Sequence, residues 1–294
     1  MTAHDVLAGQ FEDHRPHLRA VAYRMLGSFT EAEDAVQEAW LRLARSESGD
    51  IANLGGWLTT VVSRVCLDML RRRKARREES LEDRLPDLVV SLDEVAGPEH
   101  EVLLADSVGV ALLVVLESLT PPERLAFVLH DMFGLPFEQI APIVDRTPAT
   151  AKKLASRARR RVRDMAPRPD TGLDTQRRVV DAFLSAARRG DFAALVSILD
   201  PDVVLRADGG VLTGGLQVFR GVPAVTGQLA TFRRMATTVV GRPALVNGFA
   251  GLVSTLDGKP VSVMSFTVVD GKIATLDILA DPERLAQLDL AGGR

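Results

Sequence analysis

Cysteine, histidine and aromatic residues are scarce in this sequence of 294 residues, and each shortage excludes a class of site. The single cysteine, Cys66, excludes intrachain disulfides and a cysteine-based zinc site. No hydrophobic run approaches the roughly 18 residues that a membrane helix needs. The first residues also lack the basic and then apolar pattern of a secretory signal. We therefore expect a reduced, cytoplasmic protein without a membrane partner.

The last 120 or so residues lack the usual acid–base side chains. All five histidines precede residue 131, the one tyrosine is Tyr23, and both tryptophans precede residue 58. A buried aspartate such as Asp208 or Asp277 could have a raised pKa, yet it would lack an aromatic hydroxyl partner. We therefore expect no catalytic residue, no cofactor and no metal. With 46% hydrophobic and 26% charged residues, the chain is otherwise an ordinary globular sequence for two or three compact units.

The net charge of −3 is distributed unevenly along the chain. Residues 71–77 hold six basic residues and residues 152–163 hold seven, whereas residues 78–145 hold fifteen acidic residues against two basic ones. Attraction to phosphate is local, because salt screens it over about 8–10 Å. Either cluster alone could be a solvated helix end, but the pair indicates two contacts with one polyanion.

The region 6–80 reads as helical. From Thr30, residues Ala32, Val36, Ala39 and Leu43 follow the spacing of a buried helical stripe. Thr30 and Glu33 have the form of a capping box. The opposite face carries an exposed leucine among polar groups, which indicates a partner surface or a solitary exposed leucine. This face consists of Asp34, Gln37, Glu38 and Leu41.

The next apolar stripe begins at Trp57 and continues into the first basic cluster. Arg64, Asp68 and Arg71 lie off this stripe at intervals of three to four residues, so they share an exposed face. A helix that is anchored at its start and cationic at its end is suited to lie along a phosphate backbone.

A helix-turn-helix is expected further along the chain. Phe137 to Val144 form a short amphipathic helix, Asp145 and Arg146 turn, and Thr147-Pro148 begin a basic helix that ends at Arg163. The second helix starts with the small residues Ala149, Thr150 and Ala151, which permit close approach to base edges. The alternative is a helical hairpin that does not touch DNA.

Beyond the boundary at Pro167–Gly172 the pattern changes to α+β. We expect helices at 175–189 and 221–236, and strands at 252–256, 261–269 and 273–279 joined by Asp-Gly turns. Met264, Phe266 and Val268 should share one face of an antiparallel sheet, with the helices on one side.

The first 165 residues resemble an extracytoplasmic-function (ECF) sigma factor of the sigma-70 family. The resemblance rests on several ordered motifs: His14-Arg15-Pro16, residues 22–27, 32–42, 57–62 and 70–73, and the helix-turn-helix. It implies a sigma region 2 and a sigma region 4, both all-α, which bind core RNA polymerase and promoter DNA. The free energy of binding would then drive the opening of promoter DNA, without a covalent step.

The resemblance also assigns roles to individual residues. Asp34, Gln37, Glu38 and Leu41 would face the clamp of the polymerase β′ subunit, and region 4 would contact the β flap. The −10 element would be held, with a base pocket in loop 46–56, by Asn53, Arg64, Arg71, Arg72, Arg73, Lys74, Arg76 and Arg77. The −35 duplex would be contacted by Thr150, Lys152, Lys153, Arg157 and Arg159.

The C-terminal residues resemble a SnoaL-like domain, a cone-shaped α+β domain of the cystatin-like or NTF2-like type. Its fusion to region 4 marks a SigJ-like subgroup, in which the extension modulates sigma activity in place of a separate anti-sigma protein. Three motifs that are typical of the subgroup are present here in altered form. Arg84 replaces an aromatic residue before Leu85-Pro86, Val211 replaces the last glycine after Asp208-Gly209-Gly210, and residues 281–285 are a charge-similar variant of the third motif. The regulatory contact residues would be Leu85, Pro86, Asp208, Gly209, Gly210, Asp281 and Pro282. A turn that needs positive φ would equally explain the two glycines.

These observations predict five segments. They are region 2 (1–80), an acidic linker (81–105), region 4 (106–166), a linker (167–174) and a regulatory domain (175–294). The extension takes either a small-molecule ligand or an intramolecular docking contact. Two alternatives to a sigma factor are a ligand-responsive helix-turn-helix regulator and a cyclase or isomerase fused to a DNA-binding domain.

Overall fold

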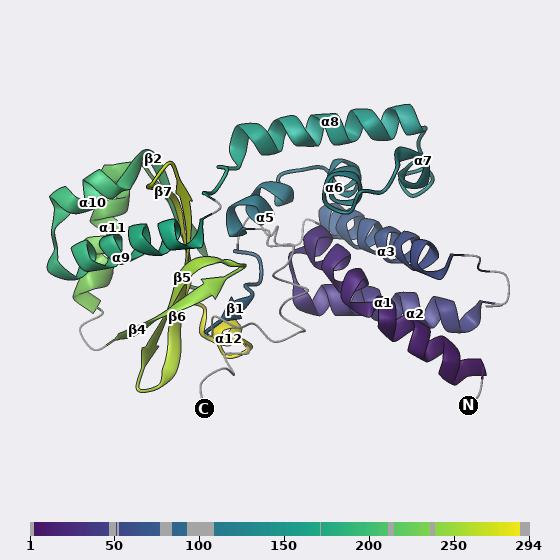
Figure 1. Cartoon of the computed structure of the whole chain (residues 1–294), viewed down its shortest axis with the longest axis horizontal. Coiled ribbons are helices and arrows are strands. Elements are labelled where there is room, and N and C mark those ends of the chain that lie inside the picture. Colours follow the sequence, from purple (N-terminus) through teal and green to yellow (C-terminus); the bar gives the residue numbers. More distant parts are fainter. Residues whose placement is uncertain are drawn as a thin grey trace. The chain divides into compact units, whose positions relative to one another are not determined.

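The computed structural model describes residues 3–46, 51, 53–76, 84–92, 109–170, 172–210, 215–235 and 239–288 (Figure 1). The chain forms two compact units. The first consists of Met1–Leu81 and Val115–Met165, and the second consists of Glu82–Val114 and Ala166–Arg294.

Three helices form the N-terminal part of the first unit: α1 (Ala3–Leu26), α2 (Phe29–Arg45) and α3 (Leu54–Arg76). The expected stripe on α2 is confirmed, because Ala32, Val36, Ala39 and Leu43 are buried. The expected capping box at Thr30 is wrong. The N-cap is Ser28, and the Glu33 carboxylate instead pairs with arginines of α1, because these charged partners lie across the helix bundle.

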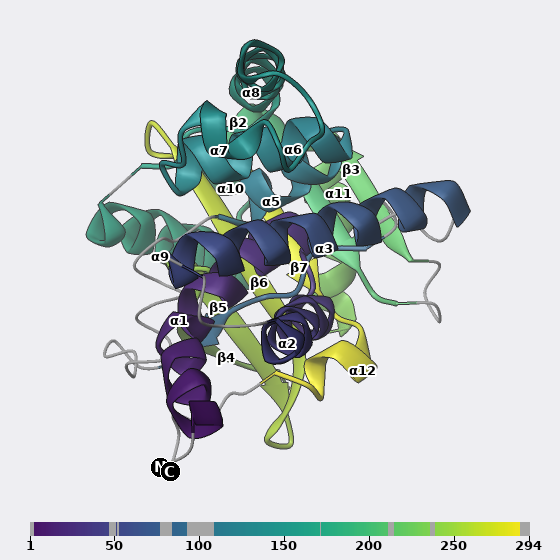
Figure 2. The ribbon, with the colours of Figure 1, turned by 90° about the vertical axis from the view of Figure 1, so that its right-hand side faces the viewer.

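The same unit also contains α6 (Pro121–Phe127), the π-helical turn η3 (Val128–Met132), α7 (Phe137–Ile140) and α8 (Pro148–Met165). Figure 2 shows α8 above α6 and α7. Small side chains let α8 pack closely, since Ala151, Ala155 and Ala158 are its buried residues. The first helix of the expected helix-turn-helix is shorter than predicted: it ends at Ile140 and is followed by turns, with Asp145 at φ +55°.

The described residues of the second unit form a sheet of seven strands in the order β1-β4-β5-β6-β7-β2-β3. The strands are β1 (Val90–Ser91), β2 (Leu199–Asp208), β3 (Leu216–Arg220), β4 (Val240–Val246), β5 (Phe249–Leu256), β6 (Lys259–Val269) and β7 (Lys272–Leu279). The helices are α5 (Val110–Glu117), which crosses the boundary between units, and α9 (Leu173–Arg189), α10 (Phe192–Ile198), α11 (Val222–Met235) and α12 (Pro282–Leu285).

The two expected Asp-Gly hairpins are confirmed. Asp257 and Asp270 have φ +50°, and the glycine that follows each also has positive φ, as this turn requires. The three strands expected from the sequence, β5, β6 and β7, pair antiparallel as predicted. The sheet as a whole is mixed, because β2 pairs with β7 in parallel. The long connection through β3, α11 and β4–β6 makes this parallel pairing feasible.

Each face of the sheet carries its own hydrophobic core. On one face, Phe266, Val268 and Met264 pack with residues of α9, α10 and α11, and the rings of Phe183 and Phe266 lie 5.5 Å apart. Figure 1 shows these three helices on one side of the sheet. The other face packs against the segment 84–92 and α12, through Leu85, Leu88, Val90 and Leu285. This segment, from within the region expected to be a linker, is therefore part of the core of the second unit.

Candidate nucleic-acid interface and the docked connecting segment

The outer face of α2 is polar with one exposed leucine. Asp34 and Gln37 are exposed, and the Leu41 side chain keeps 40% of its surface exposed. The Glu38 carboxylate accepts a hydrogen bond of 2.9 Å from Arg42, one turn further along the helix. The structure thus places the four predicted partner residues on one accessible face.

The basic end of α3 divides into exposed and inward side chains. Arg71, Arg72 and Lys74 are exposed. Arg73 instead turns inward, pairs with Glu31 of α2, and lies 4.0 Å from a carboxylate oxygen of Glu117. The side chain of Arg76 and the whole of Arg77 lie outside the described residues. Among the described side chains of this cluster, Arg71, Arg72 and Lys74 are thus accessible to a phosphate, whereas Arg73 is engaged inside the unit.

Arg64 is exposed on α3 and contacts the helix-turn-helix. Its Nη2 donates a hydrogen bond of 3.1 Å to the backbone oxygen of Pro142. Asn53 lies at the start of α3, where its Oδ1 accepts a hydrogen bond of 3.0 Å from the Gly56 amide. Asn53 is thus a helix cap, and residues 47–50 and 52 of loop 46–56 lie outside the described residues. The base pocket there stays a prediction.

On α8, Lys152, Lys153 and Arg157 are exposed. The Thr150 amide donates a hydrogen bond of 3.3 Å to the Thr147 hydroxyl, which caps the helix. Arg159 pairs with Asp131, so part of its charge is neutralised inside the unit. The two lysines near the helix start present charge to a polyanion most directly.

A buried arginine that sequence reasoning missed joins α1, α5 and α6. Arg124 is 2% exposed, and its Nε and Nη2 donate hydrogen bonds of 3.2 and 3.0 Å to the Arg24 carbonyl in the last turn of α1. Its Nη1 donates to a Glu117 carboxylate oxygen at 2.6 Å. The sequence signal for Arg124 was that it is one of two basic residues in the acidic stretch 78–145.

Asp208 at the end of β2 holds the segment 84–92. Its Oδ2 accepts hydrogen bonds from the Leu85 amide at 2.8 Å and from Arg284 Nη1 at 2.6 Å. The other amino group of Arg284 donates to Asp87 at 3.0 Å. Leu85 and Pro86 are buried, and Asp208 is 1% exposed. Hydrogen bonds to a buried charge are among the stronger contacts available to a backbone amide.

The structure also brings Asp281, Pro282, Gly209 and Gly210 to this place. Asp281 caps α12, which begins at Pro282, by accepting hydrogen bonds from the next two amides of that helix. Gly210 has φ +72°, and a Cβ there would lie 2.6 Å from an Asp281 carboxylate oxygen. The positive φ and the contact with α12 therefore both require a glycine.

Asp87, Arg284 and Asn247 complete the contact and were not predicted as site residues. Asn247, at φ +49°, accepts a hydrogen bond of 3.1 Å from the Val89 amide with its Oδ1. The backbone amide of Asn247 donates a hydrogen bond of 2.7 Å to the Val89 carbonyl oxygen. A positive-φ Asn-Gly pair between apolar runs was the sequence signal for a turn, but its long-range partner could not be read from it.

The second buried aspartate, Asp277, lies on β7 beside Arg206 of β2, with which it forms an ion pair. Complete burial raises the pKa of the Asp277 carboxyl, and the neighbouring arginine acts in the opposite direction. Both aspartates that could have served an acid–base reaction thus hold arginines, an arrangement typical of structural ion pairs.

Within the described ranges, no cluster of three or more histidine, cysteine, aspartate or glutamate side chains is arranged to hold a metal ion. None of the helices in those ranges is both long enough and apolar enough to cross a membrane.

Comparison with known proteins gives matches over the whole chain. Residues 10–76 match the family model of sigma-70 region 2, and residues 109–162 match that of sigma-70 region 4. A Mycobacterium tuberculosis protein described as a probable ECF RNA polymerase sigma factor, SigI, is 35% identical over 302 residues, covering 100% of both chains. The ECF RNA polymerase sigma factor SigJ of the same organism is 37% identical over 94% of this chain and 92% of that protein. The crystal structure of SigJ has a TM-score of 0.78 and 34% identity, and covers 96% of this chain and 99% of the other.

Proposed function

We infer the roles of individual surfaces from one premise: the chain belongs to the ECF sigma factors of RNA polymerase. It is therefore a promoter-specificity subunit, which binds the core enzyme and directs initiation. The observation that carries this conclusion is 35% identity to a named ECF sigma factor along the full length of both chains.

We propose that the exposed face of α2 binds the clamp of the β′ subunit and that the helix-turn-helix part binds the β flap. Leu41 supports the first assignment, because an exposed leucine flanked by Asp34, Gln37 and Glu38 gives an apolar contact with a polar rim. The protein would act where the polymerase is, in the cytoplasm.

Promoter DNA would contact both basic clusters. We propose that Arg71, Arg72 and Lys74 attract the −10 strand, with Asn53, Arg64, Arg76 and Arg77 as further candidates. On α8, Lys152, Lys153 and Arg157 would contact the −35 duplex. The roles proposed for Arg73 and Arg159 require that their ion pairs with Glu31 and Asp131 open first. DNA binding would therefore compete with contacts inside the first unit.

We propose that the domain division is region 2 at 1–80, region 4 at 106–166 and a SnoaL-like regulatory domain at 175–294. The segment 84–92, which connects the two DNA-binding parts in sequence, packs on the regulatory domain through Leu85 and Asp208. Holding this segment limits how far the connection can extend, so docking would modulate promoter binding. Sigma factors are not enzymes as a family, and we propose that the extension is likewise regulatory and not catalytic.

Core binding is tested by pull-down of purified core polymerase, followed by run-off transcription at a cognate promoter. Leu41→Asp should reduce the amount of sigma retained, because it puts a charge into an apolar contact. Val218→Asp is the matched control, since Val218 is similarly exposed at 45% but lies on β3. Failure of the unaltered protein to bind core would contradict the proposal, and equal losses in both variants would contradict the placement on α2.

A further inference from the structure

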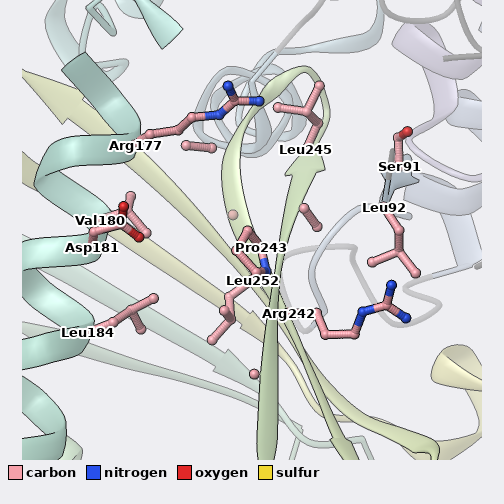
Figure 3. Close-up of a pocket in the computed structure, with 14 residues that line it drawn as sticks. Ser91, Leu92, Arg177, Val180, Asp181, Leu184, Arg242, Pro243, Leu245 and Leu252 are labelled. Atoms are coloured by element: carbon pink, nitrogen blue, oxygen red, sulfur yellow. The ribbon is translucent and has the colours of Figure 1, made fainter. Parts of the chain in front are cut away.

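A cavity of about 500 Å³ lies between α9 and the β4–β5 hairpin of the second unit, beside the end of β1 (Figure 3). This volume lies within the range of about 300–1,000 Å³ that is typical of pockets for small organic ligands. The cavity serves none of the polymerase or promoter contacts proposed above.

The two strands present small residues to the cavity. Gly241, Ala244, Ala250 and Gly251 are among its lining residues. A Cβ at Gly251 would lie 2.5 Å from Val246 Cγ2 and 2.7 Å from the Met264 carbonyl oxygen, so no side chain fits there. At Gly241 a Cβ would lie 3.2 Å from Leu252 Cδ1, the end of a flexible side chain, so a larger residue there would push into the cavity wall.

The walls combine an apolar body with charges. Val180 and Leu184 of α9 and Leu252 of β5 supply apolar surface. Arg177 and Asp181 stand one turn apart on the same helix, so they border the same side of the cavity, as Figure 3 shows. Arg177 is half-buried, which strengthens its attraction for an anion relative to a fully solvated guanidinium.

The edge of β4 argues against a peptide as the occupant. In the described residues β1 pairs with Leu245 and Val246 alone, so the rest of β4 is not covered by β1. An added strand would need backbone donors along this edge, and Pro243, which lines the cavity, has none. The features of the cavity therefore fit a small molecule better than an added β-strand.

We propose that this cavity binds a small amphipathic monocarboxylate, with its carboxylate on Arg177 and its apolar body against Val180, Leu184 and Leu252. A guanidinium binds a carboxylate through two parallel hydrogen bonds, which no neutral ligand of the same shape can replace. Arg242 also lines the cavity, so two arginines face the one carboxylate of Asp181 and the lining favours an anion. Asp181 can accept a hydrogen bond from a ligand hydroxyl.

The ligand would also contact the connecting segment. Ser91 of β1 and Leu92 line the cavity, and they belong to the segment 84–92 that Asp208 holds. A ligand that touches α9, β4 and this segment together favours the docked arrangement, because it binds that arrangement more tightly than the undocked one. The inference deepens the proposed regulation, and its test needs neither polymerase nor DNA, so the two can fail separately.

The test is isothermal titration calorimetry of the full chain with sodium decanoate, octanoate, decanol and decylammonium. The expected result is saturable one-to-one binding of a carboxylate, with decanol and decylammonium much weaker. Arg177→Gln should weaken carboxylate binding by about tenfold or more. Arg178→Gln is the matched control, because the neighbouring arginine is exposed, donates to Thr175 and does not line the cavity.

A second variant, Gly241→Val, fills the cavity without removing a charge and should also weaken binding. Failure of both carboxylates to bind would overturn the proposal, as would equal binding of decanol or an unchanged affinity in Arg177→Gln. Hydrogen exchange at Ser91 and Leu92 should slow when decanoate is added. An unchanged exchange rate would overturn the link between the cavity and the connecting segment.

Discussion

The backbone amide of Leu85 donates a hydrogen bond of 2.8 Å to the carboxylate of Asp208, although 123 residues separate them in the chain. The same carboxylate oxygen accepts a hydrogen bond from Arg284, which also reaches Asp87. One buried charge thus fixes both the segment 84–92 and α12 on the sheet. Removal of the C-terminal residues would expose the apolar side chains of this segment, so point substitutions test the contact more cleanly than truncation does.

Asp208→Ala should release the segment 84–92 from the sheet. The substitution leaves the Leu85 amide without its acceptor and Arg284 without one of its two carboxylates, at a cost of about 3 kcal/mol. Hydrogen exchange at Leu85 and Val89 should accelerate, and urea unfolding should report the lost stability. Asp202→Ala, on the same strand but exposed, should change neither measurement; equal effects of both variants would refute the assignment to the docking contact.

A comparison of Gly210→Ala with Gly258→Ala separates the cost of a positive φ from the cost of a steric clash. Gly210 has φ +72° and Gly258 has φ +77°, but a Cβ at Gly258 would meet no atom within 4 Å, whereas a Cβ at Gly210 would collide with Asp281. Gly258→Ala should cost about 1 kcal/mol from the positive φ alone, and Gly210→Ala more, roughly 2–4 kcal/mol. Urea unfolding measures both, and an equal loss would mean that the contact with α12 adds nothing.

Lys152→Ala combined with Lys153→Ala should weaken binding to a promoter duplex and flatten its dependence on salt. If both lysines contact phosphates, the slope of log affinity against log salt should fall in magnitude by about 2. Fluorescence anisotropy of labelled duplex with the polymerase holoenzyme measures this slope. Lys259→Ala with Lys272→Ala removes the same charge from exposed positions of the second unit. Parallel losses in both double variants would indicate only a general charge effect.

Arg124→Met should strongly destabilise the first unit. The change leaves the Arg24 carbonyl without its donor and Glu117 without its nearest cation, which typically costs about 3–5 kcal/mol for a buried pair. Urea unfolding followed by the fluorescence of Trp40 and Trp57, both in this unit, measures the loss. The double variant Arg124→Met with Glu117→Gln should lose less than the sum of the two single variants. Strict additivity would show that the pair is not coupled.

Cys66 provides a prediction of pH dependence. Complete burial raises the pKa of the Cys66 thiol well above its ordinary value. The folded state therefore keeps the proton when the unfolded state, with a thiol pKa of about 8.5, releases it. Stability should fall as pH rises above about 8.5, by at most ~1.4 kcal/mol per pH unit from this group. Cys66→Ala should remove that part of the slope in denaturant midpoints measured from pH 7 to 10, and native protein should not react with a thiol reagent until it is unfolded. Rapid reaction of the native thiol would contradict its burial.

Local patterns in the sequence were sufficient for the helices of the first unit and for the hairpins of the second. The stripe on α2 and the Asp-Gly turns depend on neighbours within a few residues, and the structure has both where they were expected. The same holds for the helix-turn-helix, although α7 ends earlier than its apolar pattern suggested. The roles of the basic residues in DNA binding stay predictions, because exposure alone does not identify a partner.

The sequence by itself determined the kind of protein, since its basic clusters, ordered motifs and turn signals are properties of short stretches of chain. Only the tertiary structure decided that Val90 pairs with Val246, which adds β1 to the edge of the sheet at β4. It also decided that β2 runs parallel to β7. It also decided that Arg73 and Arg124 serve ion pairs inside the first unit. Such pairings join residues that are far apart in the chain, and they depend on register and on the burial of charge, which no local pattern specifies.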